Sequence, residues 1–174
     1  MNICVFLSAY DESGTYEPIV AELGERIGQG GHTLVYGASD QGLMRVIAQT
    51  ARVNGAPVIG VTIPKFQEVA MVELDELIVA EHLEQRKQYF MEKSDAFVVL
   101  PGGIGTVDEL AFILEMKKHK AHQKTVAILN LGGFYDPLRQ QLLLMEERGF
   151  LSQPLDYYVQ FVSSVDELFE ILAT

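Results

Sequence analysis

The sequence lacks several features that would define a membrane or secreted protein. It has no uninterrupted apolar run of about 18 residues, so we predict no membrane-spanning helix. The first ten residues, MNICVFLSAY, carry no basic segment, so we expect no signal peptide. Cys4 is the single cysteine and cannot form an internal disulfide; we interpret it as a small buried hydrophobe rather than a reactive thiol. Together these features predict a cytoplasmic protein.

Basic residues are also scarce. The chain has 13 lysines and arginines against 24 aspartates and glutamates, a formal net charge of −11. Such a surface repels nucleic acids and anionic membranes, so we expect neither as a partner. If the protein binds an anion, it must do so in a local pocket of backbone N–H groups or of clustered arginine and lysine side chains.

What the 174 residues do contain is an alternation of short apolar strands and amphipathic helices. We predict strands over 2–7, 32–37, 57–63, 76–81, 95–100, 124–130 and 157–162, helices over 15–31, 41–55, 82–94, 104–118, about 136–148 and after Ser164, and a loop over 64–75. This order is typical of a parallel sheet covered on both faces, a Rossmann-like three-layer α/β/α fold in a single domain spanning 1–174. In such sheets, ligands bind beyond the carboxyl ends of the strands.

The segment VVLPGGIGTVDEL, residues 98–110, places three glycines between a strand and a helix. Gly102, Gly103 and Gly105 permit positive φ angles and carry no Cβ, so several backbone N–H groups can turn toward one point. The helix that follows adds its unpaired N–H groups and the positive end of its dipole. We predict a phosphate site, to which Thr106 adds a hydroxyl unless it caps the helix; the alternative is a tight turn without a ligand. The segment has no Walker lysine, and Asp108 stands where a dinucleotide motif has glycine.

Two charged residues near this turn have two interpretations each. The spacing of Thr106 and Glu109 is that of a capping box, which on spacing alone favours a structural role for Glu109 over a chemical one. Arg86 shares a helix face with Leu83 and Phe90, which predicts that it leans inward toward the sheet. The alternative is an arginine that extends along the surface into water.

The histidines give no metal signal. His82, His119 and His122 have no convincing spacing with aspartate, glutamate or cysteine, and we interpret them as surface residues. We predict neither a metal site nor a cofactor.

These motifs together resemble the Lonely Guy (LOG) family. The resemblance rests on Arg-Lys at 86–87, SDAF at 94–97 and PGGIGTVDE at 101–109, with supporting matches at 35–44 and 130–138, so it covers nearly the whole chain. Members are often labelled lysine decarboxylases, but no lysine here stands in a recognisable pyridoxal-phosphate setting.

The resemblance implies a phosphoribohydrolase with a Rossmann-like fold, usually a homodimer. Such enzymes cleave the N-glycosidic bond of a purine nucleoside 5′-monophosphate, either AMP or an N6-modified (cytokinin) nucleotide, to free base and ribose 5-phosphate. It assigns catalysis to Arg86 and Glu109, where the carboxylate would stabilise positive charge on the ribose or activate water. The substrate-binding residues that we predict are Ser8, Gly37, Ser39, Gly42, Met44, Lys87, Gly102, Gly103, Ile104, Gly105 and Thr106.

The chain departs from the family pattern at two loops. Residues 8–10 are Ser-Ala-Tyr where the family usually has Gly-Ser-Ser, and residues 37–39 are Gly-Ala-Ser in place of three glycines. The residue after Met44 is Arg45 instead of glycine. These changes fall at the base-and-ribose end of the expected site. They leave open a second interpretation, a non-catalytic binder of a nucleotide or phosphorylated cofactor, similar to molybdenum-cofactor carriers.

Overall fold

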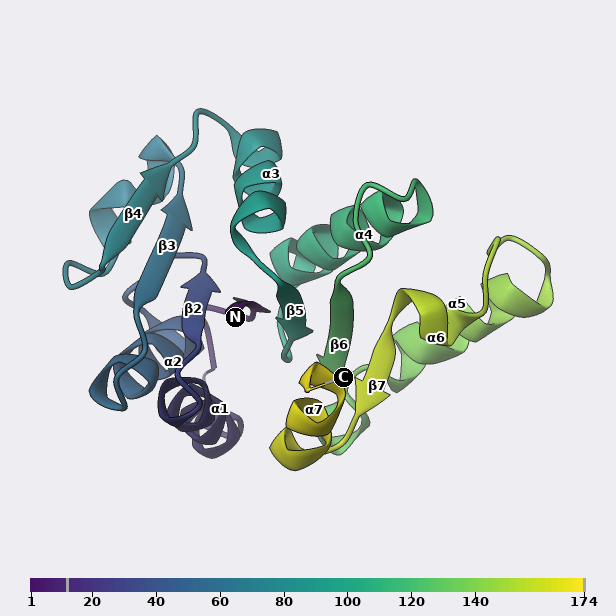
Figure 1. Cartoon of the computed structure of the whole chain (residues 1–174), viewed down its shortest axis with the longest axis horizontal. Coiled ribbons are helices and arrows are strands. Elements are labelled where there is room, and N and C mark those ends of the chain that lie inside the picture. The colour runs from purple at the N-terminus through teal and green to yellow at the C-terminus, as the bar shows by residue number, and fades with distance from the viewer. Residues whose placement is uncertain (12, 174) are drawn as a thin grey trace.

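The computed structural model describes residues 1–11 and 13–173, which build one seven-stranded parallel sheet flanked by helices (Figure 1). The strands are β1 (Asn2–Phe6), β2 (Thr33–Tyr36), β3 (Val58–Thr62), β4 (Glu76–Val79), β5 (Ala96–Val99), β6 (Thr125–Leu129) and β7 (Gln160–Val162). The helices are α1 (Glu17–Gln29), α2 (Gly42–Val53), α3 (Leu83–Lys93), α4 (Ile104–Lys118), α5 (Asp136–Glu147), α6 (Leu155–Tyr158) and α7 (Val165–Leu172), with 3₁₀ turns η1 (Pro64–Val69) and η2 (Leu131–Gly133). The predicted α/β class is confirmed.

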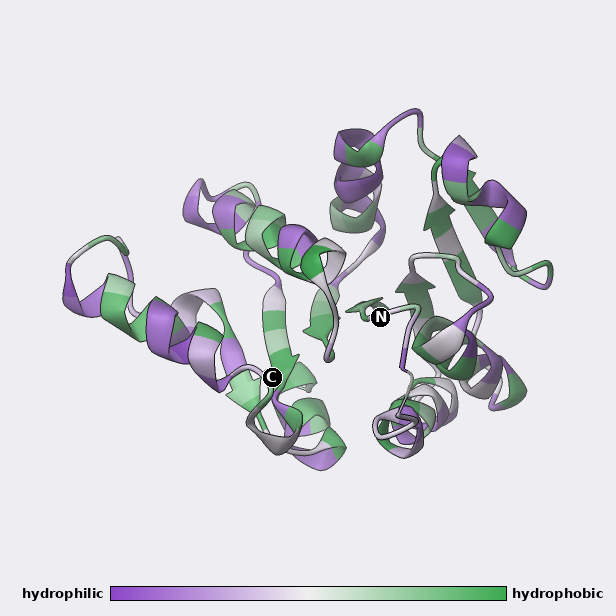
Figure 2. Ribbon diagram, turned by 180° about the vertical axis from the view of Figure 1, so that it is seen from behind, coloured by the Kyte–Doolittle hydropathy of each residue, from purple (hydrophilic) through white to green (hydrophobic). Residues whose placement is uncertain are grey.

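Each face of the sheet has its own hydrophobic core. Along β1, Ile3 and Val5 pack with α1, α2 and α7, whereas Cys4 and Phe6 pack with α3, α4 and α6. The alternation follows from the two-residue period of a strand, and burial on both faces explains why the inner strands are mostly apolar (Figure 2). Among the described residues, no helix has the length and apolarity that crossing a bilayer requires.

The strand order is β4-β3-β2-β1-β5-β6-β7, so the direction of winding reverses between β1 and β5. These two strands pair in parallel, with Val5 opposite Val98 and Phe6 opposite Val99. The loops that follow them diverge to opposite sides and leave a crevice at their carboxyl ends. This position brings together the loops after β1, β2 and β5.

Two segments differ from the sequence prediction. The predicted loop over 64–75 begins with η1, and the predicted strand over 157–162 is shortened to β7 because α6 occupies its first residues. In both places a proline, Pro64 or Pro154, stands at the start of the helical turn. Proline has its φ angle fixed near the helical value and donates no hydrogen bond, which suits the first position of a helix.

Candidate active site

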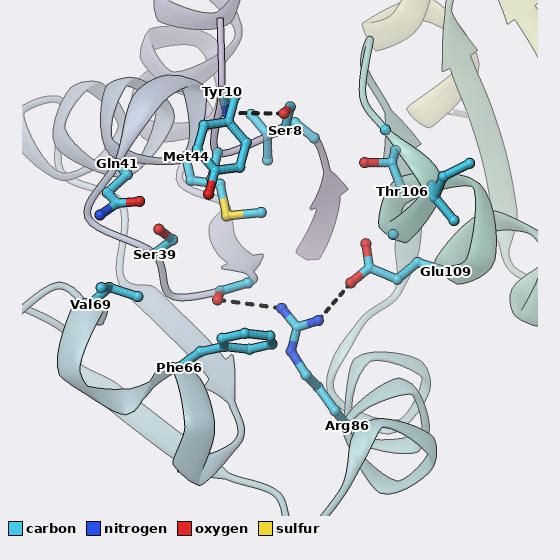
Figure 3. A pocket seen from close by; sticks show the side chains of 16 residues that line it. Ser8, Tyr10, Ser39, Gln41, Met44, Phe66, Val69, Arg86, Thr106 and Glu109 are labelled. Carbon is cyan, nitrogen blue, oxygen red and sulfur yellow. Dashed lines mark hydrogen bonds and ion pairs between the residues drawn. The ribbon is translucent and has the colours of Figure 1, made fainter.

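A cavity of about 430 Å³ opens at the carboxyl ends of β1, β2 and β5 (Figure 3). Its lining residues are Leu7, Ser8, Ala9, Tyr10, Gly37, Ser39, Gln41, Met44, Phe66, Val69, Arg86, Gly103, Ile104, Gly105, Thr106 and Glu109. Ten of the thirteen site residues predicted from the sequence line this one cavity.

Arg86 enters the cavity from α3, and its side chain is only 12% exposed. Its Nε donates to the carbonyl oxygen of Val61 at 2.9 Å, its Nη2 to that of Gly37 at 3.3 Å, and its Nη1 to Glu109 Oε1 at 2.8 Å. The guanidinium carbon also lies 4.8 Å from the centre of the Phe90 ring. The predicted inward orientation is confirmed. Gly37 makes it possible, because a Cβ there would lie 2.6 Å from Nη2.

Glu109 does not cap a helix, so the capping-box interpretation is wrong. Helix α4 begins at Ile104 with Gly103 as its N-cap, which makes Thr106 the third helical residue. Glu109 therefore lies in the second turn, where its carboxylate meets Arg86 instead of a free backbone N–H. The cap position, not the spacing of the two side chains, decides between the two roles.

The Glu109 carboxyl group is held in a strongly perturbed environment. Burial, with a smaller contribution from Asp108, raises its pKa to about 7, although the neighbouring Arg86 and Lys87 act in the opposite direction. A carboxyl group that titrates near neutral pH in a cavity can both accept and return a proton. Cys4 lies fully buried nearby, and burial together with Glu109 raises the pKa of its thiol, in keeping with a small hydrophobe.

The glycine turn works differently from the prediction. None of Gly102, Gly103 and Gly105 has a positive φ angle, and Gly103 is extended at φ −92° and ψ −158°. Gly102 is required for close approach, since a Cβ there would lie 2.2 Å from Thr106 Oγ1. The N–H groups in the first turn of α4, which starts at Ile104, have no acceptor within the helix and lie at its positive end. The geometry is suited to an anion.

Three predicted substrate-binding residues do not line the cavity. Lys87, on α3, pairs with both carboxylate oxygens of Asp108, on α4, at 3.0 Å. Gly102 lies behind the turn, and Gly42 packs so closely on the chain that a Cβ would lie 2.0 Å from the carbonyl oxygen of Ala9. Their contact with a ligand stays a prediction.

Six lining residues were not among the predicted binding residues: Leu7, Ala9, Tyr10, Gln41, Phe66 and Val69. Ala9 and Tyr10 belong to the loop at 8–10, which was expected at the base-and-ribose end of the site. Phe66 and Val69 belong to η1, inside the segment that was predicted to be a loop. The chain there is held by hydrogen bonds from Asp40 N to the carbonyl oxygen of Val69 and from Met71 N to that of Ala38, both 2.8 Å. The only local signal was the presence of apolar residues in an otherwise polar loop. Their place in the cavity depends on this pairing with the loop after β2.

One histidine differs from the prediction that all three lie at the surface. His122 is 6% exposed, its Nε2 lies 2.9 Å from the carbonyl oxygen of Ile113, and burial lowers its pKa. His82 instead caps α3 by accepting a hydrogen bond from Gln85 N. Within 1–11 and 13–173, no group of three or more histidine, cysteine or acidic residues is placed to hold a metal ion.

Fold and site together define a Rossmann-like α/β protein with a buried arginine–carboxylate pair beside a glycine turn. Residues 44–172 match the protein family described as "Possible lysine decarboxylase". The chain belongs to this family. The named relatives described next are its Lonely Guy (LOG) members. The match covers the helix with Arg86 and the whole glycine turn.

Relatives of known name agree with this assignment. The chain is 33% identical, over 98% of its length and 71% of the relative's, to a probable cytokinin riboside 5′-monophosphate phosphoribohydrolase of Oryza sativa subsp. japonica. A second protein from that plant, named cytokinin riboside 5′-monophosphate phosphoribohydrolase LOG, is 34% identical. The alignment covers 87% of this chain and 64% of that protein. The protein of the same enzyme name from Mycobacterium tuberculosis is 35% identical over 87% of this chain and 82% of its own.

Solved structures share the fold. The molybdenum cofactor binding protein from Rippkaea orientalis aligns with a TM-score of 0.72 at 22% identity, covering 99% of this chain and 93% of the other. The molybdenum cofactor carrier protein from Chlamydomonas reinhardtii aligns with a TM-score of 0.71 at 23% identity, covering 99% and 98%. At these identities the likeness extends to the fold alone.

Proposed function

We propose that the protein hydrolyses the N-glycosidic bond of a purine nucleoside 5′-monophosphate and releases the free base and ribose 5-phosphate. The observation that carries the proposal is the Arg86–Glu109 pair, buried in the cavity within two helical turns of the glycine turn. The names of the relatives, which are nucleotide phosphoribohydrolases, support this reaction class.

The cavity suggests how such a nucleotide lies. Figure 3 shows Thr106 and Glu109 on one side and Ser39 and Val69 on the opposite side, with Arg86 between them. The start of α4 suits the phosphate, because its N–H groups and dipole favour an anion on an otherwise acidic protein. The ribose then lies beside Glu109. The base extends toward the loop after β2 and η1, where the wall is largely apolar.

Glu109 and Arg86 take complementary roles in this scheme. When the bond between C1′ and the base nitrogen breaks, positive charge develops on the ribose, as in glycoside hydrolysis. The ionised Glu109 stabilises that charge or removes a proton from the water that attacks C1′. Arg86 holds the carboxylate at 2.8 Å and has hydrogen bonds to two backbone carbonyl groups that fix its own position.

We further propose AMP and its N6-substituted analogues as the substrates, and a homodimer as the working assembly. Light scattering tests the assembly directly. A mass near twice 19.4 kDa supports the dimer, and a mass near 19.4 kDa contradicts it.

The reaction is tested by measuring adenine and ribose 5-phosphate released from AMP and from N6-isopentenyl-AMP. Replacing Glu109 with glutamine should lower the rate roughly a hundredfold or more, because an amide neither ionises nor accepts the proton. Glu115→Gln is the matched control, since it makes the same exchange on the same helix at an exposed carboxylate that bonds His119 at 2.8 Å. The control should keep the wild-type rate.

The outcomes separate the proposal from its rival. If the wild-type protein binds AMP but releases no product, it is a binder, and the altered loops at residues 8–10 and 37–39 are the first places to examine. If Glu109→Gln retains full turnover in a folded protein, Glu109 is not the catalytic carboxylate.

A further inference from the structure

The segment after β6, residues 130–136, is held by hydrogen bonds among its own residues and contacts the chain just before the glycine turn. Asn130 Oδ1 accepts a hydrogen bond from Tyr135 N at 2.7 Å, and its Nδ2 donates to Asp136 Oδ1 at 2.7 Å. Gly133 has a φ angle of +75°, and a Cβ there would lie 2.6 Å from Asp136 Oδ2. These contacts fix Tyr135 at the start of α5 with its ring buried in the core.

The hydroxyl group of Tyr135 reaches the strand-to-helix connection. It donates to the carbonyl oxygen of Leu100 at 2.8 Å and also interacts with the backbone of Gly102, so its two contacts lie on either side of Pro101. Leu100 N in turn donates to the carbonyl oxygen of Phe6 at 2.9 Å. The path of the chain from β5 into the glycine turn is thus held by a side chain more than thirty residues away in sequence.

The hydroxyl group of Tyr135 remains protonated and can therefore donate its hydrogen bond at any physiological pH. Tyr135 is 3% exposed, and burial raises the pKa of its phenol to about 12. The group therefore stays neutral and keeps its proton across the physiological pH range.

Phe134 supports the arrangement from the side. Its ring lies edge-on to Tyr135 at 4.9 Å and edge-on to Tyr16 at 6.2 Å. Together with Pro101 and Gly102, it lines a smaller hollow of about 170 Å³, which shares Ser8 and Tyr10 with the large cavity. The aromatic cluster therefore lies beside Pro101 and Gly102, the part of the turn that does not line the large cavity.

We propose that Tyr135 is a positioning residue for phosphate recognition, whose hydroxyl sets the orientation of the backbone over 100–103 and hence of the N–H groups that begin α4. Tyr135 does not line the large cavity and touches no ligand there, so it acts through the turn. The inference rests on the proposed function in one respect, that the ligand carries a phosphate group. It gives a role to the segment NLGGFYDPL, 130–138, which the family resemblance marked without explaining.

The test uses Tyr135→Phe, which removes the hydroxyl and keeps the ring. Calorimetry measures the affinity of the full chain for ribose 5-phosphate, AMP and adenosine. We expect affinity for the two phosphorylated ligands to fall roughly five- to tenfold, the range for one lost hydrogen bond, with adenosine unchanged. In turnover assays, KM for AMP should rise while kcat stays within about twofold, because Glu109 is not displaced.

Tyr158→Phe is the matched control. Tyr158 is also buried, at 4% exposed, and its hydroxyl lies 2.8 Å from Ser152 Oγ in a hydrogen bond, but it belongs to α6 and does not line the cavity. It should lose stability without losing affinity for phosphate. If Tyr135→Phe fails to fold, Asn130→Ala replaces it, because it removes the acceptor that fixes Tyr135 N.

The outcomes are separable. Unchanged affinity for ribose 5-phosphate, an equal loss for adenosine, or an equal loss in Tyr158→Phe each overturns the role of Tyr135. Selective loss of phosphate affinity in a protein without turnover upholds the positioning role and contradicts only the proposed hydrolysis. A wild-type protein that binds neither ribose 5-phosphate nor AMP overturns the inference itself.

Discussion

The buried carboxyl group of Glu109 should make the protein less stable, relative to its Glu109→Gln variant, as the pH rises from 5 to 8. Burial raises the pKa of this group from the ordinary 4.5 to about 7, so the folded protein binds the proton more tightly than the unfolded chain does. The stabilising contribution is fully present below pH 4.5 and is lost as the pH rises through 7. At about 1.4 kcal/mol per pH unit, the interval between 4.5 and 7 corresponds to about 3 kcal/mol.

Urea unfolding of both proteins at pH 5, 6, 7 and 8 measures this effect. Glutamine resembles the neutral acid in shape and does not titrate, so the difference in unfolding free energy isolates Glu109. Glu115→Gln serves as the control. Hydrogen bonding to His119 lowers the pKa of that exposed carboxylate, so its contribution to stability is lost as the pH falls, the opposite direction to Glu109. If the wild-type protein instead gains stability relative to Glu109→Gln as the pH rises, the attraction of Arg86 outweighs burial and the reasoning fails.

Three further predictions concern the cavity. The kcat/KM for AMP should rise through pH 7 and then level off, following ionisation of Glu109; a profile flat from pH 5 to 8 contradicts a base with this pKa. Gly37→Ala should lower kcat about tenfold or more in a folded protein, since its Cβ would lie 2.6 Å from Arg86 Nη2; an unchanged rate shows that turnover does not depend on the position of the guanidinium group. Phe66→Ala should raise KM for AMP severalfold without changing affinity for ribose 5-phosphate, because the ring lines the end of the cavity proposed for the base; equal losses for both ligands contradict this placement.

The sheet was predictable because each inner strand is recognisable from its own short apolar run. Runs such as ICVF and AFVV are buried on both faces, so they are continuously apolar, whereas the helices between them repeat their apolar residues every three or four positions. The two misassigned segments both follow a proline, Pro64 or Pro154. A proline ends a strand and begins a helical turn equally well, and the local sequence does not distinguish the two outcomes.

The role of Glu109 depended on which residue is the N-cap of α4, and the spacing of Thr106 and Glu109 does not identify that residue. A threonine and a glutamate three positions apart form a capping box only when the threonine is the N-cap. Here the N-cap is Gly103, as the predicted helix start at residue 104 requires, so Glu109 lies in the second turn and faces Arg86 on another helix. Spacing within one helix predicts which residues share a face, but the partner across the cavity comes from the packing of α3 against α4.

The two ends of the cavity are built by different means, and this decides what the altered loops change. The end that suits phosphate comes from one continuous turn before α4, where Gly102, Gly103 and Gly105 are all retained. The opposite end depends on pairing between separate segments. There Ala38, which stands where the family usually has glycine, adopts a φ angle of +67° and is fully buried, and its carbonyl oxygen accepts the hydrogen bond from Met71 N. Since surrounding contacts hold this strained residue in the conformation that glycine adopts easily, the loop survives the substitution. We therefore expect the departures to alter which base is preferred while the arginine–carboxylate pair keeps the reaction class.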